Sequence, residues 1–268
     1  MTSFLSLDYG RATDEIVRFI REIVGGKNVV IGLSGGLDSS VTAVLLVKAL
    51  GSEKVYGLIM PAYFTPQEDV EDAKWLAEYL KIDYKIIPID RIVNSFADSV
   101  SLNHEDEKYR MPFANLRARI RMSLLYFYSN LMDGLVAGTG DKSEILIGYY
   151  TKYGDGGVDF LPIAHLYKTQ VRELGSYLGL PRRIYAKPSA PRLYPGHTAL
   201  SELPVDYSKL DVLLHDIFDK GLGVEESAKN AGLPIDVAVW VCRRYHATEH
   251  KRRMPPSLLK IEHSPPII

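Results

Sequence analysis

The chain has 268 residues and a formal net charge of −1 at pH 7, with 46% hydrophobic and 24% charged residues. These values fit a soluble globular protein with a substantial core, and they argue against disorder and against broad, non-specific binding to nucleic acid or membrane. The single cysteine, Cys242, excludes an intrachain disulfide and a cysteine-rich metal site.

Apolar periodicity predicts alternating helices and strands through the first half of the chain. In order, these are a helix at 14–24, a strand at 28–33, a helix at 39–50, a strand at 54–60, a helix at 65–80, a strand at 83–89, helices at 91–100 and 112–131, and a strand at 134–138. Helices at 210–220, 224–231 and 234–250 follow. This alternation predicts an α/β fold, a doubly wound parallel sheet flanked by helices with a helical C-terminal part, in one domain over 1–268.

No basic segment leads into a long apolar run near the first residue, and no later run approaches the length of a membrane span. We therefore expect a cytoplasmic protein without a membrane partner, and no DNA or RNA partner.

The helix expected at 65–80 carries a start signal in its first residues. Thr65 is suited to accept a backbone N–H bond, Pro66 needs no donor, and Glu68 is placed to reach back to the start. We therefore predict a capping box that begins at Thr65.

The turn between the strand at 28–33 and the helix at 39–50 has the composition of an anion site. Ser34, Gly35 and Gly36 let backbone N–H groups and the positive helix end face phosphate oxygens. Asp38 stands where a P-loop would carry lysine, so γ-phosphoryl transfer is not indicated. A carboxylate beside phosphates requires a hard cation such as Mg²⁺ between them. The alternative is a plain glycine turn with Asp38 capping the helix.

Polar residues also follow the strand at 134–138, at the same expected sheet edge. Glu144 lies about one helical turn into the next element and is suited to share Mg²⁺ with Asp38. A solvated Glu favoured by the helix dipole is the alternative. Lys168, at a helix start, is a candidate cation for phosphate, although such a lysine is often only solvated.

Two loops carry further candidate side chains. The glycine-rich segment 151–159 interleaves Lys152, Asp155 and Asp159 with an aromatic residue, and loops on rigid scaffolds often bind ligands. The turn 187–190 is suited to present Ser189 and the Lys187 ammonium.

The helix at 112–131 is apolar on nearly every side. Its predicted core stripe comprises Phe113, Leu116, Ile120, Leu124, Phe127 and Leu131. Its opposite side carries Ala118, Leu125 and Ser129, which we expect to pack against a second copy in a homodimer. Asn115 and Arg119, one turn apart, form a possible clamp for a polar ligand.

Two other patterns indicate different functions. His246 and His250 are spaced for zinc on one helix, but the Glu of a metalloprotease motif is replaced by Ala247. Residues 223–241 resemble a helix-turn-helix with a basic tail, which leaves a DNA-binding module as the rival class.

Together these motifs closely resemble the ammonia-dependent NAD synthetase family of the N-type ATP pyrophosphatases. The matching stretches are Gly32-Leu-Ser-Gly-Gly-Leu-Asp-Ser39, Asn115-Leu-Arg-Ala-Arg-Ile-Arg-Met122, residues 138–144, 151–159, 166–170 and 187–190, and His250-Lys-Arg. The resemblance implies an adenine nucleotide alpha hydrolase-like fold, without a glutaminase domain, and a homodimer.

The resemblance also implies roles for individual residues. ATP contacts would come from Gly32, Leu33, Ser34, Gly35, Gly36, Leu37, Asp38, Ser39, Thr139, Lys168 and Ser189. Mg²⁺ would be held by Asp38 and Glu144. Deamido-NAD, which is nicotinic acid adenine dinucleotide, would contact Arg119, Lys152, Asp159, His250 and Lys251.

The implied reaction is the last step of NAD biosynthesis, an amidation of deamido-NAD with free ammonia. The nicotinate carboxylate attacks the α-phosphate of ATP, pyrophosphate leaves, and ammonia then displaces AMP from the acyl adenylate. Asp38, Lys168 and Asp155 are the catalytic candidates: Lys168 would offset charge at the α-phosphate, and Asp155 would hold or deprotonate ammonium. Other members of this superfamily aminate another nucleotide or thiolate RNA, but thiolation commonly uses paired cysteines, which Cys242 alone cannot provide.

One segment departs from the family pattern. The family commonly has Asp-Glu after Pro-Gly-Gln-Thr, whereas this chain reads Pro-Gly-His-Thr-Ala-Leu at 195–200. The change puts in question loop closure over substrate and any second metal there, with Glu202 as a possible substitute. Ala114 also stands before Asn115, where glycine is common.

Overall fold

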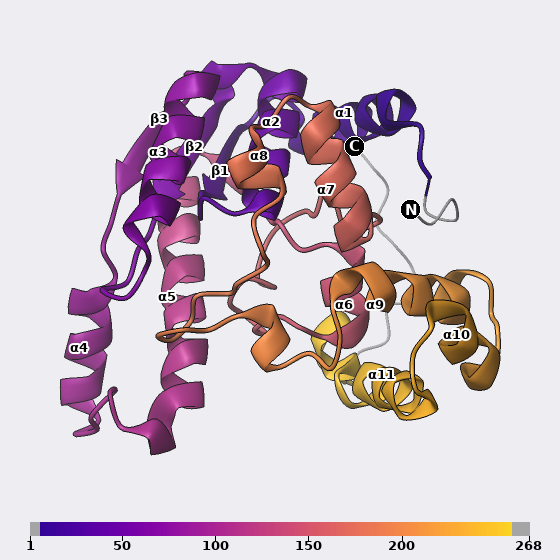
Figure 1. Ribbon diagram of the computed structural model, residues 1–268. Coiled ribbons are helices and arrows are strands. Elements are labelled where there is room, and N and C mark those ends of the chain that lie inside the picture. The colour runs from indigo at the N-terminus through magenta and orange to yellow at the C-terminus, as the bar shows by residue number, and fades with distance from the viewer. Residues whose placement is uncertain (1–5, 259–268) are drawn as a thin grey trace.

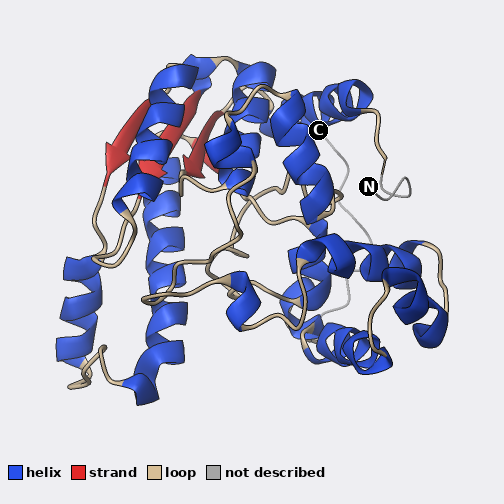
Figure 2. Cartoon of the chain, in the orientation of Figure 1, coloured by secondary structure: helices blue, strands red, loops and turns tan. Residues whose placement is uncertain are grey.

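A computed structural model describes residues 6–258 and places a four-stranded parallel sheet at one end of the molecule (Figures 1 and 2). The strands are β1 (Asn28–Gly32), β2 (Val55–Ile59), β3 (Asp83–Ile86) and β4 (Gly134–Ala137), in the order β3-β2-β1-β4. In register, Val30 of β1 lies beside Tyr56 of β2 and Val136 of β4. The order of strands reverses after β1, so the predicted doubly wound sheet is confirmed.

Helices cover both faces of this sheet and then form a separate helical group. They are α1 (Tyr9–Val24), α2 (Leu37–Leu50), α3 (Gln67–Leu80), α4 (Asp90–Ser99), α5 (Arg110–Leu131), α6 (Lys142–Ile147), α7 (Lys168–Tyr177), α8 (Arg182–Tyr185), α9 (Tyr207–Leu214), α10 (Val224–Ala231), α11 (Ile235–Ala247) and α12 (Glu249–Arg252). Short 3₁₀ turns occupy Ser52–Lys54, Glu107–Tyr109 and Ala199–Ser201, and a π-helical turn spans His215–Asp219.

Alternate residues of β1 point into different cores. Val29 and Ile31 pack with α1, α2 and α7, whereas Val30 packs with α4 and α5 on the other face. All three are fully buried, as expected for a central strand that is covered on both sides. The core therefore fixes β1, and with it the turn that follows β1.

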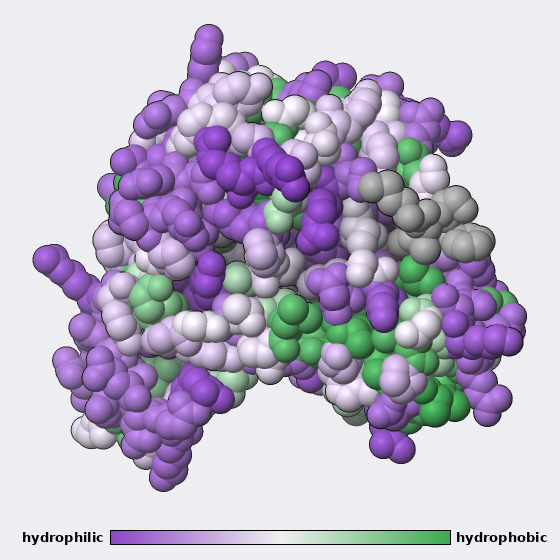
Figure 3. Space-filling view, in the orientation of Figure 1, coloured by the Kyte–Doolittle hydropathy of each residue, from purple (hydrophilic) through white to green (hydrophobic). Residues whose placement is uncertain are grey.

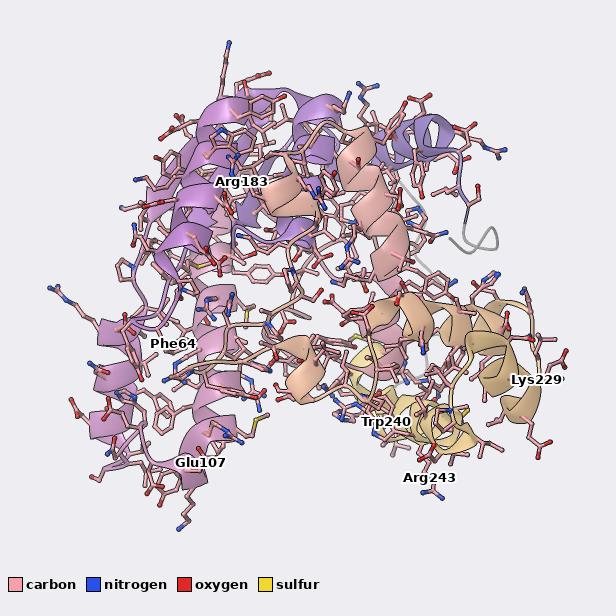
Figure 4. All side chains as sticks on the ribbon, in the orientation of Figure 1. Phe64, Glu107, Arg183, Lys229, Trp240 and Arg243 are labelled. Atoms are coloured by element: carbon pink, nitrogen blue, oxygen red, sulfur yellow. The ribbon has the colours of Figure 1, made fainter. Side chains whose placement is uncertain are left out.

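The helices after α8 have a hydrophobic core of their own. Their buried side chains include Leu210 and Leu213 from α9, Ala228 from α10, and Ala238 and Val241 from α11. In Figure 3, hydrophobic residues gather over this part of the surface. The segment with helix-turn-helix spacing thus uses its apolar residues to build this core, while Arg243 points outward from α11 (Figure 4).

Several predicted boundaries are wrong in detail. The strand at 83–89 ends at Ile86, the helix at 210–220 gives way to the π-helical turn, and the helix at 234–250 breaks at Thr248. The capping box predicted at Thr65 is also wrong. The α3 N-cap is Pro66, and Thr65 Oγ1 instead accepts the Ala62 N–H at 2.9 Å, because this hydroxyl closes the preceding turn.

The predicted faces of α5 need correction. Phe127 and Leu131, assigned to the core, are 63% and 68% exposed, whereas Ala118 and Ser129, assigned to the partner surface, are buried. Leu125 is half-buried and approaches Gly32 at the end of β1. Apolar residues occur all around α5, so the sequence alone did not distinguish its buried side from its exposed side. The sheet covers one side of the helix, and this packing determines which residues are buried.

Among residues 6–258, no helix is both long and apolar enough to cross a bilayer.

Candidate active site

The backbone of the turn after β1 packs closely against the start of α3. Gly35 has a φ of +73°, and a Cβ on it would lie 2.0 Å from the Asp69 carbonyl oxygen at the start of α3. The Gly36 N–H donates to Ser34 Oγ at 3.2 Å, and Ser39 Oγ donates to the Gly36 carbonyl. We call residues 34–39 the glycine corner. Only glycine fits at position 35 of this corner.

The corner opens into a pocket of about 470 Å³ at the carboxyl edge of the sheet. Residues after β1, β2 and β4 line it, together with α5, the loop at 148–158 and the loop at 187–193. This is the edge where parallel α/β sheets bind ligands. The pocket is concave and large enough for a nucleotide-sized ligand.

Three carboxylates and one ammonium meet at the pocket floor. Lys168 Nζ lies 2.7 Å from Asp38 Oδ2 and 2.8 Å from both Glu144 Oε1 and Asp141 Oδ2. Asp38 comes from the first turn of α2, Asp141 and Glu144 from the start of α6, and Lys168 from the start of α7. We refer to these four residues as the carboxylate cluster.

Burial dominates the electrostatics of the carboxylate cluster. It raises the pKa of Asp141 to about 7 against the attraction of Lys168, and burial with the Asp141 charge raises the pKa of Glu144 well above its usual value. Burial opposes charge on Lys168, but the three carboxylates outweigh it and hold its pKa high. Lys168 thus stays protonated, while Asp141 and Glu144 hold a proton more tightly than ordinary carboxyl groups do.

The carboxylate cluster has the donor set of a hard cation site. Oxygens of Asp38, Asp141 and Glu144 all lie within 4.8 Å of one another, the only such group of three or more candidate ligands in the described part of the chain. Within that part, Asp38 Oδ1 is buried without a hydrogen-bond partner. An all-oxygen set with an unsatisfied carboxylate oxygen fits Mg²⁺.

Asp141 is a candidate ligand that the sequence analysis missed. Its Oδ1 caps α6 by accepting the Glu144 N–H at 2.8 Å, and Glu144 Oε2 accepts the Asp141 N–H at 3.4 Å. The sequence does contain a sign of this arrangement: Asp141 and Glu144 follow a strand and stand three residues apart, which is the spacing of a capping box. That capping box sets both carboxylates at the same helix start.

Cations line other parts of the pocket wall: Arg121, Lys187, Arg192, Arg244 and Lys251. Arg121 Nε donates to the Met60 carbonyl at 3.0 Å, and no ion pair joins it to a carboxylate of residues 6–258. Burial lowers the pKa of Arg121 to about 10. A pocket with acids at the floor and cations on its walls suits a polyanion bound together with a metal.

The predicted ATP residues mostly meet in this pocket. Lining it are Gly32, Leu33, Ser34, Gly36, Leu37, Asp38, Ser39, Thr139 and Ser189. Gly35 and Lys168 are not among the lining residues. Gly35 packs against the Asp69 carbonyl, and the side chain of Lys168 has no exposed surface. Lys168 therefore reaches the pocket only through its three carboxylate partners.

Four of the five predicted dinucleotide residues lie outside the pocket wall. Arg119 is exposed and donates from Nε to the Lys152 carbonyl at 3.3 Å, and His250 is exposed on α12. Asp159 accepts the Val136 N–H and the Tyr126 hydroxyl, at 2.7 and 3.1 Å.

Lys251 is the member of this set that does line the pocket. Its ammonium donates to the carbonyls of Gly148 and Tyr150, at 2.7 and 2.5 Å. Burial lowers its pKa.

Asp155 lines the pocket beside these cations. The Thr151 N–H donates to its Oδ1 at 2.8 Å. The residue is open to solvent through the pocket, yet the surrounding protein raises the pKa of its carboxyl by desolvation, opposed by the Thr151 N–H and by Lys251 and Arg121. A carboxylate so placed can accept a proton inside the pocket.

Hydrogen bonds from Lys187 hold the glycine corner against α3, a contact that the sequence analysis missed. Lys187 Nζ donates to the Gly35 carbonyl at 3.0 Å and to Asp69 and Asp72 of α3, at 2.9 and 2.6 Å. Arg183, labelled in Figure 4, donates from Nε to the other carboxylate oxygen of Asp72, Oδ1, at 2.8 Å. The Lys187 ammonium therefore links the corner to α3 and to the loop that carries Ser189.

The loop that departs from the family pattern is held by other contacts. His197 is buried, stacks on Tyr194 with ring centroids 4.0 Å apart, and places Nε2 3.3 Å from Glu202 Oε1. Desolvation lowers the pKa of His197, opposed by Glu202. Ala199 is buried and Leu200 is 62% exposed. Glu202 thus serves this loop as a partner of His197.

Comparison with known proteins gives a consistent result over nearly the whole chain. A sequence profile described as NAD synthase matches residues 12–255. The chain is 51% identical over 261 residues to an NH(3)-dependent NAD(+) synthetase of Hyperthermus butylicus, covering 96% of this chain and 93% of that protein.

Solved structures agree. An NMN synthetase from Francisella tularensis has a TM-score of 0.80 at 31% identity, covering 94% of this chain and 99% of the other. An NH3-dependent NAD synthetase from Campylobacter jejuni has a TM-score of 0.78 at 33% identity, covering 95% and 100%.

Proposed function

The chain belongs to the NAD synthase family, and we propose that the pocket described above is where it converts deamido-NAD to NAD with ATP and ammonia, releasing AMP and pyrophosphate. The observation that carries the site assignment is the carboxylate cluster directly beside the glycine corner. The first can hold a divalent cation and the second can face phosphate oxygens.

ATP binds with its phosphates at the glycine corner. The N–H groups there and the start of α2 supply positive charge, and Thr139 and Ser189 line the same pocket. Pyrophosphate is the group that leaves, so charge develops on the β-phosphate side, where these donors and the metal site lie.

Mg²⁺ would be held by Asp38 and Glu144, and the short distances between their oxygens and those of Asp141 support adding Asp141 to this set. When bound, the ion neutralises phosphate charge and orients the leaving pyrophosphate. Lys168 holds the three carboxylates together from within the protein. This revises the expected direct contact of Lys168 with ATP, because its ammonium is fully enclosed by the cluster.

The acceptor approaches from the side of α5 and the loop at 151–159. Arg119, Lys152, Asp159 and His250 lie beyond the pocket wall, where they are suited to contact the distal part of a long dinucleotide. Lys251 lies at the pocket itself. Asp155 holds ammonium and takes its proton before ammonia attacks the acyl adenylate.

A homodimer accounts for the exposed apolar residues beside this acceptor path. α4 and α5 are neighbours (Figure 1), and their exposed large hydrophobic residues are Ile92, Phe96, Met111, Phe127 and Leu131. Arg119 lies two turns before Phe127 on α5 and is also exposed. We therefore place the dimer contact on the exposed face of α4 and α5. We also infer a cytoplasmic location, with no nucleic-acid partner.

The test is an incubation of the purified protein with ATP, Mg²⁺, ammonium and deamido-NAD, followed by separation of the nucleotides. We expect NAD and AMP in equal amounts. ADP as the product, or no product, would contradict the proposal. Because one structural neighbour is an NMN synthetase, the deamidated mononucleotide is offered in a parallel reaction. Guanylate formation is tested with xanthylate as the acceptor.

A further inference from the structure

One face of α9 supports the carboxylate cluster from behind. α9 belongs to the C-terminal helical group, and it contacts both α6 and α7 (Figure 1). Tyr207 and Asp211 lie one turn apart on it, so both side chains point to the same side. Both are buried, and both reach the start of α7.

Asp211 joins the starts of two helices. Its Oδ1 accepts the Ser143 hydroxyl at 2.6 Å, and its Oδ2 accepts the Thr169 N–H at 2.8 Å. Ser143 Oγ in turn accepts the Lys168 N–H at 2.9 Å. The first residues of α6 and α7, which carry Glu144 and Lys168, are thus connected through one carboxylate.

The placement of this carboxylate is costly, which indicates that its hydrogen bonds matter. Asp211 has no exposed surface, and burial raises its pKa to about 6 even though Ser143 and Thr169 oppose the shift. A buried carboxylate persists where donors satisfy its oxygens, and helix starts provide such donors. Asp211 takes one donor from each helix start.

Tyr207 covers the other end of the same lysine. Its ring lies 5.3 Å from Lys168 Nζ, and its hydroxyl, buried at the pocket wall, has no hydrogen-bond partner among residues 6–258. α9 therefore holds Lys168 at its backbone through Asp211 and Ser143, and encloses its ammonium with an aromatic face.

We propose that Asp211, with Tyr207 on the same face of α9, is a positioning residue that fixes Lys168 and the starts of α6 and α7 for the proposed reaction. The inference rests on the proposed function, but its structural part does not depend on turnover. It assigns the C-terminal helical group a role in the chemistry of the sheet edge.

The structural part is tested by amide hydrogen exchange on ligand-free protein. In Asp211→Asn one acceptor oxygen is lost, and in Ser143→Ala the Lys168 N–H loses its acceptor. We expect the amides of Lys168 and Thr169 to exchange about tenfold faster in these variants. The Thr169 amide bonds the Asp211 carboxylate directly, and the Lys168 amide bonds the Ser143 hydroxyl that donates to this carboxylate. Unchanged exchange in both variants overturns the proposal, whether or not the wild-type protein makes NAD.

Asp216→Asn is the matched control for the kinetic arm. Asp216 is a buried carboxylate of the same helical group, and its oxygens accept from Lys220 and Asn230, at 2.7 and 2.8 Å, away from the pocket. We expect both Asp variants to lower the melting temperature. Asp211→Asn alone should lower kcat by roughly tenfold or more, with little change in KM for deamido-NAD, because the reacting groups are displaced.

The outcomes separate cleanly. If Asp211→Asn keeps kcat within twofold of wild type while its melting temperature falls as in Asp216→Asn, Asp211 is only structural and the proposal is wrong. If Asp211→Asn fails to fold, Ser143→Ala decides by the same two readouts. If wild-type protein forms no NAD, the proposed function fails, and hydrogen exchange alone decides whether Asp211 holds the helix starts.

Discussion

Replacing Gly35 by alanine tests whether the corner after β1 is as constrained as the geometry indicates. The new Cβ would lie 2.0 Å from the Asp69 carbonyl oxygen, well inside any normal contact, and the backbone would have to keep a φ of +73°. The left-handed conformation costs alanine about 1–2 kcal/mol, and displacing packed neighbours costs roughly 1–3 kcal/mol more.

The sum is about 2–5 kcal/mol of unfolding free energy. For a chain of this size that corresponds to a fall in melting temperature of roughly 5–15 °C, which differential scanning calorimetry resolves easily. ATP affinity should fall as well, since movement of Asp69 disturbs the Lys187 ammonium that holds the Gly35 carbonyl.

Gly36→Ala is the matched control for stability. Gly36 has a φ of −91°, and a Cβ there would meet only the Ser34 hydroxyl, at 3.2 Å, which can rotate away. We expect its melting temperature to stay near that of wild type. Equal melting temperatures for the two variants would refute the assignment of strain to position 35.

Three other predictions address the metal and the dimer. The pKa of Asp141 in the folded protein is raised to about 7, so its contribution to the free energy of unfolding is full below pH 4 and is lost as the pH rises through 7. Because a metal ligand must be deprotonated, Mg²⁺ should raise the melting temperature more at pH 8 than at pH 5.5. A pH-independent effect of Mg²⁺ would contradict this. Asp38→Asn and Glu144→Gln should each raise the Mg²⁺ concentration for half-maximal AMP formation by roughly 10- to 100-fold or more, because loss of a ligand costs at least as much affinity as loss of an outer-shell partner. Wild-type curves would rule out these ligands. Phe127→Glu should sediment as a monomer, whereas Phe19→Glu on α1 should remain a dimer; a dimeric Phe127→Glu protein would exclude this face of α5.

The sheet and its glycine corner were predictable because local chemistry determines them. A run of apolar residues such as 29–33 followed by Ser34, Gly35 and Gly36 has few structural solutions. The alternation of elements then fixed the edge where Asp38 and Glu144 meet. These features depend on short stretches of chain and on connection rules that hold across α/β proteins.

The parts that escaped prediction depend on contacts between distant residues. Lys168 meets Asp38, which lies 130 positions earlier in the chain, and no local pattern shows that this lysine is enclosed. The exposed side of α5 was misassigned because apolar residues surround that helix, and only the packed sheet distinguishes Leu125 from Phe127.

The Lys168 ammonium also bears on the order of events when the protein is made. Three carboxylates brought together without a counterion would oppose formation of the domain, as in small metalloproteins that fold only when their ion is present. Here the counterion is part of the chain and arrives with α7. The domain can therefore complete its fold before any ion is loaded, and chelators should remove catalytic competence while leaving the native fold intact.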